Sequence, residues 1–336
     1  MAFLSVSIAG VVTTACKKGP EGNTEGAVFT NPVIERDWPD PTIWESGGRY
    51  YSVATGMQTI LSSTDLVHWT DTGKKPLSEA AEQKARACGS NFWAPDVVKI
   101  GKKWMLYLTC YNSDRDCGIF AFSSDSPEGP FEYVSNITHS KKTGIKDTID
   151  PEVVVDGKQV WLFFGSVGKM HRIMLNKTGD AVAEGAEYEH VGGVDIDDDP
   201  SRQSVFEGAY LHRHEGWWYL FVSSGHFGDG SYRIRVGRSH TLGGEFLDRD
   251  GRKMTSGYGT VVISSGSDDR FYGPGHNGEI FTDKNGQDYI FYHSHDHDAS
   301  RASARCTLLQ RLFWGEDGWP YMEGGSPRVT EKAPVL

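Results

Sequence analysis

Three carboxylic acids in the sequence, Asp40, Asp150 and Glu207, are candidates for acting together on one bond. Asp40 and Asp150 each precede a proline, and Glu207 opens the segment EGAYLHRHEGWWYLFVSSG. Cleavage of a glycosidic bond needs two carboxyl groups across a cleft, one that protonates the leaving oxygen and one that activates water. A third carboxylate beside the acid raises its pKa, because neighbouring negative charges disfavour ionisation. These residue types predict a base, a modulator and an acid, without saying which is which.

The three acids recur at corresponding points of an internal repeat. Five segments, spaced by roughly 55 residues with a longer last step, each begin with a short motif, run into a strand, cross a turn and continue into an aromatic-rich strand. Turn signals such as ESGG, IGKK, VDGK and DKNG separate the strand-like runs. The opening residues of the five segments are Asp40, Ala94, Asp150, Glu207 and His276.

Five similar sheets predict an all-β fold, a five-bladed β-propeller. A single blade cannot bury both of its faces, so the blades must pack against one another around an axis. Because the first strand of a blade is innermost, the five opening residues should encircle one end of the central channel. Four of these five opening residues are ionisable. Bringing ionisable side chains this close is unfavourable unless their charges are compensated or serve catalysis or binding. Helical periodicity is nearly absent, and one short polar helix is expected over residues 77–87.

The same acids also have a structural interpretation. Asp before Pro is a common turn element, so Asp40 and Asp150 could each mark no more than the entry to a strand. Glu207 has no such turn role in the sequence EGA. When the five segments are aligned, their opening residues form one column of equivalent positions, which holds three carboxylates and a histidine. This column favours a functional over a structural role for the acids. Asp96 and Glu152 fall two places later in the motif, and we interpret them as structural partners rather than reacting groups.

The composition narrows the classes of function. The chain has 336 residues, enough for one large β domain with a full core, and a formal net charge of −11. Nucleic-acid binding and binding to an anionic membrane are not expected, since both require clustered Lys and Arg. Its 40 Gly, 10 Trp, 14 Tyr and 16 Phe suit short strands joined by tight turns. Aromatic faces also suit sugar rings, although most of these side chains should be in the core.

The N-terminus resembles a bacterial export signal. We interpret residues 1–29 as a leader and tether, and residues 30–336 as the propeller domain. An apolar stretch from Phe3 to Val12, too short to span a bilayer, is followed by Cys16 and two lysines, as at a lipoprotein cleavage site. This predicts export to the periplasm, or to the outer membrane or cell surface of a bacterium through a lipid anchor at Cys16. The alternative is a disordered N-terminus.

The remaining cysteines leave their pairing open. If Cys16 carries lipid, an even number remains, which permits disulfides in an exported protein: Cys88, Cys110, Cys117 and Cys306. Cys110 and Cys117 flank a turn between two apolar runs, so a hairpin could bring them close enough to bridge. No CxxC pair is present, and a structural zinc site is therefore not expected.

Seven motifs, in order from Asn31 to about Glu323, resemble those of glycoside hydrolase family 43, and within it the arabinanases: WPDPTIW, NFWAPDVV, TIDPEVV, LFFGS, FEGAYL, YRIRVGRS and GPGHNGEIF. The resemblance implies an inverting hydrolase on a five-bladed propeller. It implies that Asp40 is the general base, that Asp150 tunes the pKa of the acid and orients it, and that Glu207 is the general acid. Inversion needs the base and the acid roughly 6.5–9.5 Å apart, so that water fits between them.

The resemblance also implies ligands. GPGHNG is similar to the arabinanase motif whose histidine points toward an ion in the central channel, usually calcium and held largely through water. It therefore implies His276 as a metal ligand, one calcium ion, and no organic cofactor. Imidazole is a poor match for calcium, so this expectation depends on the resemblance alone. Trp93, Ser166 and His276 are the implied substrate contacts, Trp93 being similar to the aromatic residue that packs against sugar near the cleavage point.

Three segments depart from the family pattern, and one of them is the loop Cys88–Asn91. Glu207 is followed by Gly-Ala, where many arabinanases have Ala-Pro. The run HSHDHD at residues 293–298 alternates His293, His295 and His297 as on one face of a strand. That run could be a second metal site, or a solvated polar segment.

The leading hypothesis is hydrolysis of α-1,5-linked L-arabinan, a plant cell-wall polysaccharide, or of arabinooligosaccharides. Within the same family, the alternative is an α-L-arabinofuranosidase or a β-xylosidase, and loops at the channel mouth would decide between them. From another class, the alternative is a non-catalytic carbohydrate-binding lipoprotein. The three intact acids argue against a pure binding protein, which has no need for crowded carboxylates.

Overall fold

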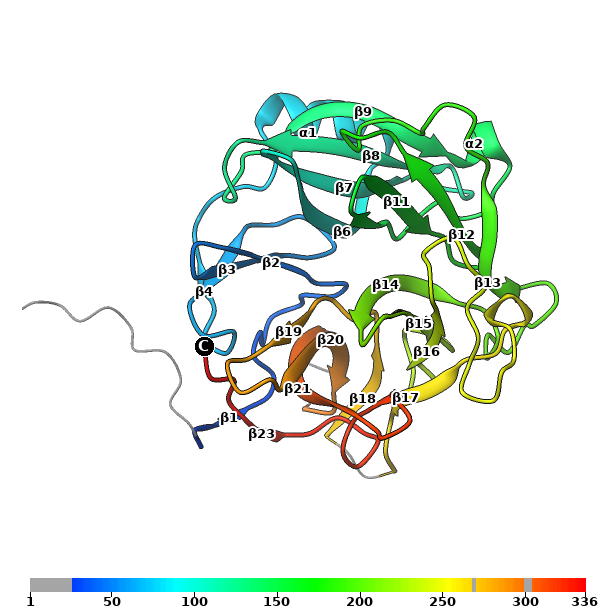
Figure 1. Ribbon diagram of the computed structural model, residues 1–336. Helices are drawn as coiled ribbons and strands as arrows, with labels where there is room; N and C mark the ends of the chain where they lie inside the picture. Colours follow the sequence, from blue (N-terminus) through cyan, green and yellow to red (C-terminus); the bar gives the residue numbers. More distant parts are fainter. Residues whose placement is uncertain (1–25, 268–269, 299–303) are drawn as a thin grey trace, which may run out of the picture.

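The computed structural model describes residues 26–267, 270–298 and 304–336 of the chain (Figure 1). Cys16 and most of the predicted leader lie outside the described residues. In the described part of the chain, no helix is both long and apolar enough to cross a bilayer. Five antiparallel sheets are arranged around a central axis, which confirms the predicted five-bladed β-propeller.

Each blade is one sheet whose first strand lies near the axis (Figure 1). Blade 1 consists of β2 (Thr42–Ser46), β3 (Arg49–Val53), β4 (Leu61–Ser63) and β5 (Thr70–Asp71). Blade 2 consists of β6 (Asn91–Ile100), β7 (Lys103–Tyr111), β8 (Cys117–Ser124) and β9 (Glu132–His139). Blade 3 consists of β10 (Glu152–Asp156), β11 (Gln159–Phe164), β12 (Gly168–Leu175) and β13 (Glu189–Asp195).

The second half of the propeller follows the same plan. Blade 4 consists of β14 (Glu207–His214), β15 (Trp217–Ser224), β16 (Arg233–Ser239) and β17 (Thr260–Ser264). Blade 5 consists of β18 (Phe271–Gly275), β20 (Asp288–Asp296), β21 (Arg305–Trp314) and β22 (Pro320–Tyr321), with β19 (Ile280–Thr282) also paired to β20. The short helices are α1 (Glu79–Cys88), α2 (Ser140–Thr143) and the 3-10 turn η1 (Met254–Ser256).

Tight turns at the start of the blades follow from the sequence. In blade 1, Gly47 and Gly48 alone connect β2 to β3, and both have positive φ, 63° and 75°. A two-residue turn with two positive φ angles matches the right-handed twist of its strands, and glycine adopts it without steric cost. The SGG signal in the sequence therefore places this hairpin.

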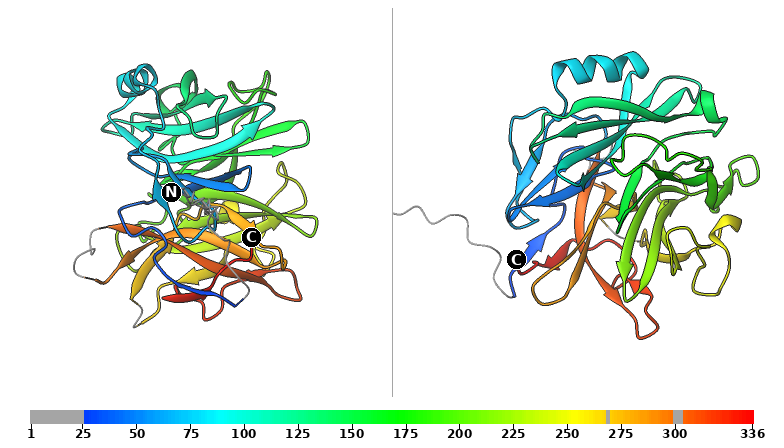
Figure 2. Two further views of the ribbon diagram at one scale, coloured as in Figure 1. Left: turned by 90° about the vertical axis from the view of Figure 1, so that its left-hand side faces the viewer. Right: turned by 45° about the horizontal axis from the view of Figure 1, so that its top comes forward.

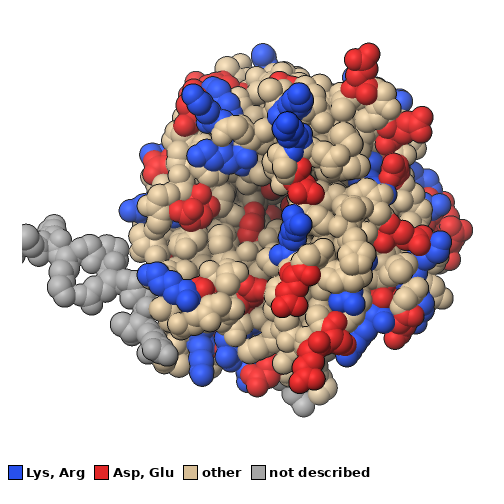
Figure 3. Space-filling view, viewed as in Figure 1, with Lys and Arg blue, Asp and Glu red and all other residues tan. Residues whose placement is uncertain are grey.

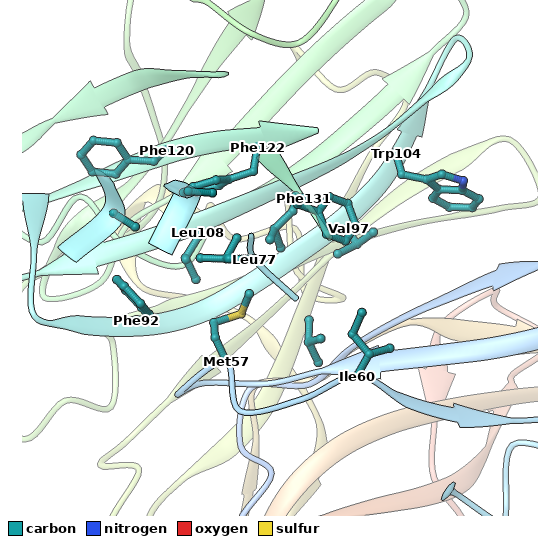
Figure 4. Packing of buried hydrophobic residues seen from close by; sticks show 14 of the residues in the cluster. Met57, Ile60, Leu77, Phe92, Val97, Trp104, Leu108, Phe120, Phe122 and Phe131 are labelled. Atoms are coloured by element: carbon teal, nitrogen blue, oxygen red, sulfur yellow. The ribbon is translucent and has the colours of Figure 1, made fainter. Parts of the chain in front are cut away.

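The predicted short helix is present as α1, on the outside of the propeller (Figure 2). Ser78 caps it by accepting a hydrogen bond from the backbone N–H of Ala81 at 3.1 Å. Ala81 and Ala85 are buried against an apolar cluster between blades 1 and 2 that includes Met57 and Phe92 (Figure 4). The helix is therefore an insertion that covers one seam of the propeller.

A ring of hydrogen bonds joins each blade to the next around the channel. In each bond, a side-chain oxygen from the first strand or first loop of one blade accepts from a backbone N–H of the following blade. The five pairs are Thr42 Oγ1 with Val97 N (3.3 Å), Asp96 Oδ2 with Val153 N (2.8 Å), Glu152 Oε1 with Leu211 N (3.1 Å), Tyr210 Oη with Ile280 N (2.9 Å) and Glu279 Oε2 with Ile43 N. The structural role predicted for Asp96 and Glu152 is thereby confirmed.

The two ends of the described chain also meet. Strand β1 (Val28–Thr30) pairs with β23 (Thr330–Lys332), and Phe29 is buried in the same apolar cluster as Ala333. The side chain of Asn31 is paired with the backbone of Leu309 on β21 through two hydrogen bonds of 3.0 Å. These contacts fix blade 1 beside blade 5 and so hold the ring closed.

The cysteines of the described chain are free thiols. On the sheet of blade 2, Cys110 lies opposite Gly118, whereas Cys117 lies opposite Tyr111. Neighbouring residues of a strand point to opposite faces, so the thiols of Cys110 and Cys117 are on opposite faces of the sheet. The bridge that the sequence leaves open between these two cysteines is therefore not formed.

Candidate active site

A pocket of about 230 Å³ opens on the axis at one end of the propeller. All five blades or the loops between their strands contribute to it. Figure 3 shows a hollow at the middle of one face of the molecule, with acidic side chains inside it. The residues that line the pocket are Asp40, Thr55, Trp93, Ile149, Asp150, Glu207, Phe227, Tyr232, His276 and Arg305. The structure thus brings together the three acids and the histidine singled out by the repeat.

The backbone at the start of the blades corrects the predicted column. Asp40, Ala94, Asp150 and His276 all have positive φ, between 40° and 57°. In blade 4 the corresponding conformation is adopted by Gly208, with φ of 60°, and not by Glu207. Glu207 therefore stands one place before the column, in the same position as the pocket residues Trp93 and Ile149. The pocket is built from two adjacent columns rather than one.

Side chains of the preceding blade hold this unfavourable backbone conformation in place. The donors are backbone N–H groups of the column, and the acceptors come from the second strand of the neighbouring blade or from the residues that follow it. The pairs are Asp40 N with His293 Nδ1 (3.2 Å), Ala94 N with Thr55 Oγ1 (2.8 Å), Asp150 N with Thr109 Oγ1 (3.0 Å) and His276 N with Ser223 Oγ (2.7 Å). Packing between blades thus sets the positions of the column residues.

Asp40 is surrounded by positive and polar groups. Its Oδ1 lies 3.1 Å from His276 Nδ1 and 3.4 Å from Arg305 Nη1, and its Oδ2 accepts a hydrogen bond from Thr55 at 2.6 Å. His293 Nδ1 is also 3.1 Å from Oδ1. Burial opposes ionisation of Asp40, but Arg305 and His276 outweigh it and hold the pKa of this carboxyl well below its usual range. Asp40 is therefore a carboxylate even in mildly acidic solution.

Asp150 is in the opposite electrostatic situation. Burial, followed by the charges of Glu207 and Asp40, raises the pKa of Asp150 to about 7, although His276 opposes the shift. The backbone N–H of Gly208 donates to the Asp150 side chain. The neighbouring carboxyl groups thus differ in their tendency to ionise, as acid and base chemistry at one site requires.

Two hydroxyl groups hold the Glu207 carboxyl. Ser166 donates to Oε2 and Tyr232 donates to Oε1, each at 2.7 Å. A hydroxyl can both donate and accept, so the same contacts suit the protonated and the ionised form of Glu207. Ser166 is buried behind Glu207 and does not line the pocket, whereas Tyr232 does.

Two aromatic residues flank the acids. Trp93 is stacked on Tyr111, with ring centroids 4.2 Å apart, which fixes the orientation of the indole at the pocket wall. Phe227 is 44% exposed at the mouth, and the Arg305 guanidinium lies 5.1 Å from its ring centroid. Flat apolar faces beside hydrogen-bonding groups are suited to sugar rings.

The histidine run at residues 293–298 is not a metal cluster, and it is solvated only at its end, where His297 and Asp298 are exposed. His293 is fully buried, with its ring stacked against Tyr232, and burial lowers its pKa to about 4. His295 and His297 both stack on Tyr272. Within the described ranges, these three histidines do not form a group at metal-binding distance, so the metal-site alternative for this run is wrong.

Six pocket or near-pocket residues were missed from the sequence: Thr55, Ile149, Phe227, Tyr232, His293 and Arg305. Tyr232 lies inside the recognised motif YRIRVGRS, which could have pointed to it. The HSHDHD run points to His293 only as a metal candidate. For Arg305 the sequence carries no local signal, because only the pairing of β21 with β20 brings it to Asp40.

The pocket lies on the propeller axis and holds crowded carboxyl groups beside an aromatic wall. These carboxyl groups differ in their tendency to ionise, which is the arrangement of a glycoside hydrolase. The chain belongs to glycosyl hydrolases family 43, whose profile matches residues 29–320. The family resemblance seen in the motifs is thereby confirmed.

Known proteins of this kind are similar along most of their length. A probable arabinan endo-1,5-alpha-L-arabinosidase A of Aspergillus flavus is 31% identical over 84% of this chain and 89% of its own. An extracellular exo-alpha-(1->5)-L-arabinofuranosidase of Cellvibrio japonicus is 27% identical over 85% and 86%. The solved structure of Cellvibrio cellulosa alpha-L-arabinanase complexed with arabinohexaose has a TM-score of 0.74 and 27% identity, covering 86% of this chain and 96% of that one.

Proposed function

We propose that this protein hydrolyses α-1,5-linked L-arabinan or arabinooligosaccharides with inversion at the anomeric carbon. The observation that carries the proposal is the pairing in one pocket of an ionised Asp40 with a Glu207 carboxyl held by two hydroxyl groups. The substrate class is supported by the similarity to arabinan-cleaving proteins over most of the chain.

In the proposed reaction, Asp40 removes a proton from water as the water oxygen attacks the anomeric carbon. The bond from that carbon to the leaving oxygen breaks, and Glu207 transfers its proton to the leaving oxygen. Asp150, which lines the same pocket as Glu207, is assigned the role of orienting and modulating this acid. Trp93 packs against the sugar and His276 contacts it from the channel side.

Product analysis tests the substrate and the reaction together. Linear arabinan, debranched arabinan and xylan are incubated with the enzyme, and the products are separated by chromatography. Ladders of arabinooligosaccharides indicate internal cleavage, and arabinose alone indicates cleavage from an end. Release of xylose only would overturn the arabinan proposal in favour of a β-xylosidase, and binding without products would favour a carbohydrate-binding protein. Proton NMR of the first products reads the configuration directly.

Removal of the Arg305 charge should shift the acidic limb of the pH profile. Arg305 is the leading contribution that lowers the pKa of Asp40, so Arg305→Met should raise that pKa. Because the base must be ionised, the acidic limb of kcat/KM should then move to higher pH. The pH dependence of kcat/KM for wild type, Arg305→Met and Arg305→Lys measures the shift. Arg305→Lys keeps the positive charge, so its acidic limb should stay near the wild-type pH. An acidic limb that does not move in Arg305→Met contradicts the role of Asp40 as base.

A calcium ion in the channel is a further part of the proposal. Below the pocket, His276 and Asn277 line a small cavity of about 20 Å³, room for roughly one water or ion. Asn277 is 3% exposed, and its Oδ1 has no hydrogen-bond partner in the described chain. Calcium prefers such oxygen ligands, so the residues fit this ion better than the histidine alone suggests. Bound there, calcium would supply positive charge against the crowded carboxyl groups.

Dialysis against EGTA tests the ion. Activity on arabinan or the melting temperature should fall, since the carboxyl groups around the channel would then repel one another without compensation. Addition of calcium, but not of magnesium, should restore the lost property, because magnesium demands a stricter octahedral geometry. If neither activity nor melting temperature changes, calcium has no place in this site.

Export is proposed from the leader-like sequence of residues 1–29 and from the extracellular location named for the Cellvibrio japonicus relative. A lipid at Cys16 would add a fixed mass to the mature N-terminus. Mass spectrometry of the protein from native membranes measures that addition directly, and an unprocessed Met1 in the mature protein would contradict export.

A further inference from the structure

A second cluster of metal-binding side chains lies between blades 4 and 5, outside the pocket. It consists of His212, His214 and Asp288, and the candidate ligand atoms of all three lie within 4.8 Å of one another. Within the described ranges, no other group of three or more such side chains is this close. The motifs that carry the family resemblance do not include any of the three.

The fold places these residues by simple rules. His212 and His214 are two positions apart on β14, so their side chains are on the same face of blade 4. Asp288 is the first residue of β20 in blade 5. Trp314, at the end of β21, stacks on His214 with ring centroids 3.7 Å apart and donates its indole N–H to Asp288 Oδ2 at 2.7 Å. One tryptophan thus positions both a histidine and the carboxylate.

The Asp288 carboxyl is buried at this seam. Asp288 is only 6% exposed, and the donors found for its carboxyl are the neutral groups of Thr282, at 2.5 Å, and Trp314. A buried carboxylate is costly unless a cation or several hydrogen bonds compensate it. His212 and His214 each offer a ring nitrogen on the side of the seam where the Asp288 carboxyl lies. Trp314 also stacks on His212, with ring centroids 5.9 Å apart, so one tryptophan contacts all three side chains.

We propose that His212, His214 and Asp288 bind a divalent first-row transition metal of the zinc class, which links blade 4 to blade 5. Two imidazoles and one carboxylate are ligands that zinc accepts, with water as the fourth. Calcium and magnesium are excluded by the two nitrogen ligands, because both ions prefer oxygen. Trp314 has the supporting role that a hydrogen-bond donor to a ligating carboxylate commonly has in metal sites.

The role of such an ion would be structural. Glu207 opens β14 at the pocket, and His212 is five residues further along the strand, about 17 Å away at roughly 3.3 Å per residue. The cluster therefore lies toward the other end of the propeller and cannot reach the reacting atoms. A bound ion would link blade 4 to blade 5, the blade that closes the ring. Because the ion binds only the folded state, it should stabilise that state by mass action.

Metal titration of the tag-free protein, stripped with a chelator and dialysed, tests the proposal. Wild type should bind one equivalent of zinc by calorimetry and by elemental analysis after gel filtration, and its melting temperature should rise with zinc but not with equal calcium. Cobalt(II) at the site should show the intense visible bands of a four-coordinate ion with nitrogen ligands. If wild-type protein binds no zinc, the proposal is overturned whatever the variants do.

Three variants assign the binding to the cluster. His212→Asn with His214→Asn should abolish the zinc-dependent rise in melting temperature. Trp314→Phe keeps the ring but loses the N–H to Asp288, and it should weaken zinc binding by roughly 10–100-fold. The control removes two exposed imidazoles elsewhere, His68→Asn with His240→Asn, and should bind zinc like wild type. Zinc binding that survives in the His212, His214 variant, or is lost in the control, contradicts the assignment.

Discussion

Glu207→Gln should lower kcat on linear arabinan by about 10²–10⁴-fold, the usual contribution of a general acid. Glutamine has nearly the same shape as glutamate and can keep hydrogen bonds with Ser166 and Tyr232, so the pocket should stay intact. It has no proton to give to the leaving oxygen. Steady-state rates on arabinan measure the loss, and calorimetric binding of an arabinooligosaccharide should remain within a few fold of wild type.

A change of leaving group identifies the step that is lost in Glu207→Gln. A nitrophenyl arabinofuranoside releases nitrophenolate, a stabilised anion that needs little protonation, so the variant should lose much less activity on this substrate than on arabinan. The matched control is Glu215→Gln, in the turn at the far end of the same strand, which should act as wild type on both substrates. Full activity of Glu207→Gln on arabinan would rule out Glu207 as the acid.

The repeat made the fold predictable, and it also explains the one error in register. In three blades the opening residue precedes a proline, so the alignment of these blades is unambiguous. The three residues are Asp40, Ala94 and Asp150. Blade 4 has no such proline, and similarity of residue type placed Glu207 in the column. The column requires positive φ, which glycine adopts most readily, and Gly208 fulfils it. A backbone requirement, and not the chemistry of the side chain, therefore defines the equivalent positions.

Contacts between blades could not be predicted from the same pattern. Alternation along a strand puts His293 and His295 on one face, but it does not say which face meets the axis. Arg305 and Thr55 reach Asp40 from different blades, and the angle between neighbouring sheets decides this approach. The histidines and the aspartate of the seam between blades 4 and 5 are likewise separated in sequence by more than 70 residues, a distance that no local motif spans.

Asp40→Asn should also abolish most activity on arabinan, by about 10²–10⁴-fold, but with a different dependence on the leaving group. Asparagine tolerates the positive φ of 53° at this position and retains the volume of aspartate. Water must be activated whatever the leaving group is, so the loss should be similar on arabinan and on the nitrophenyl arabinofuranoside. Rates on the two substrates measure this ratio. Asp125→Asn, at an exposed carboxylate of blade 2, is the control and should leave both rates unchanged.

Chemical rescue separates the missing base from a damaged pocket. Asp40→Gly keeps the backbone conformation and leaves room for azide, which needs no deprotonation before it attacks the anomeric carbon. Azide should therefore restore turnover of the nitrophenyl substrate and give a glycosyl azide of inverted configuration, identified by NMR. A retained configuration would mean attack on a covalent intermediate, which requires a nucleophile on the protein. That result, or a loss in Asp40→Asn confined to arabinan, would contradict Asp40 as the base of an inverting enzyme.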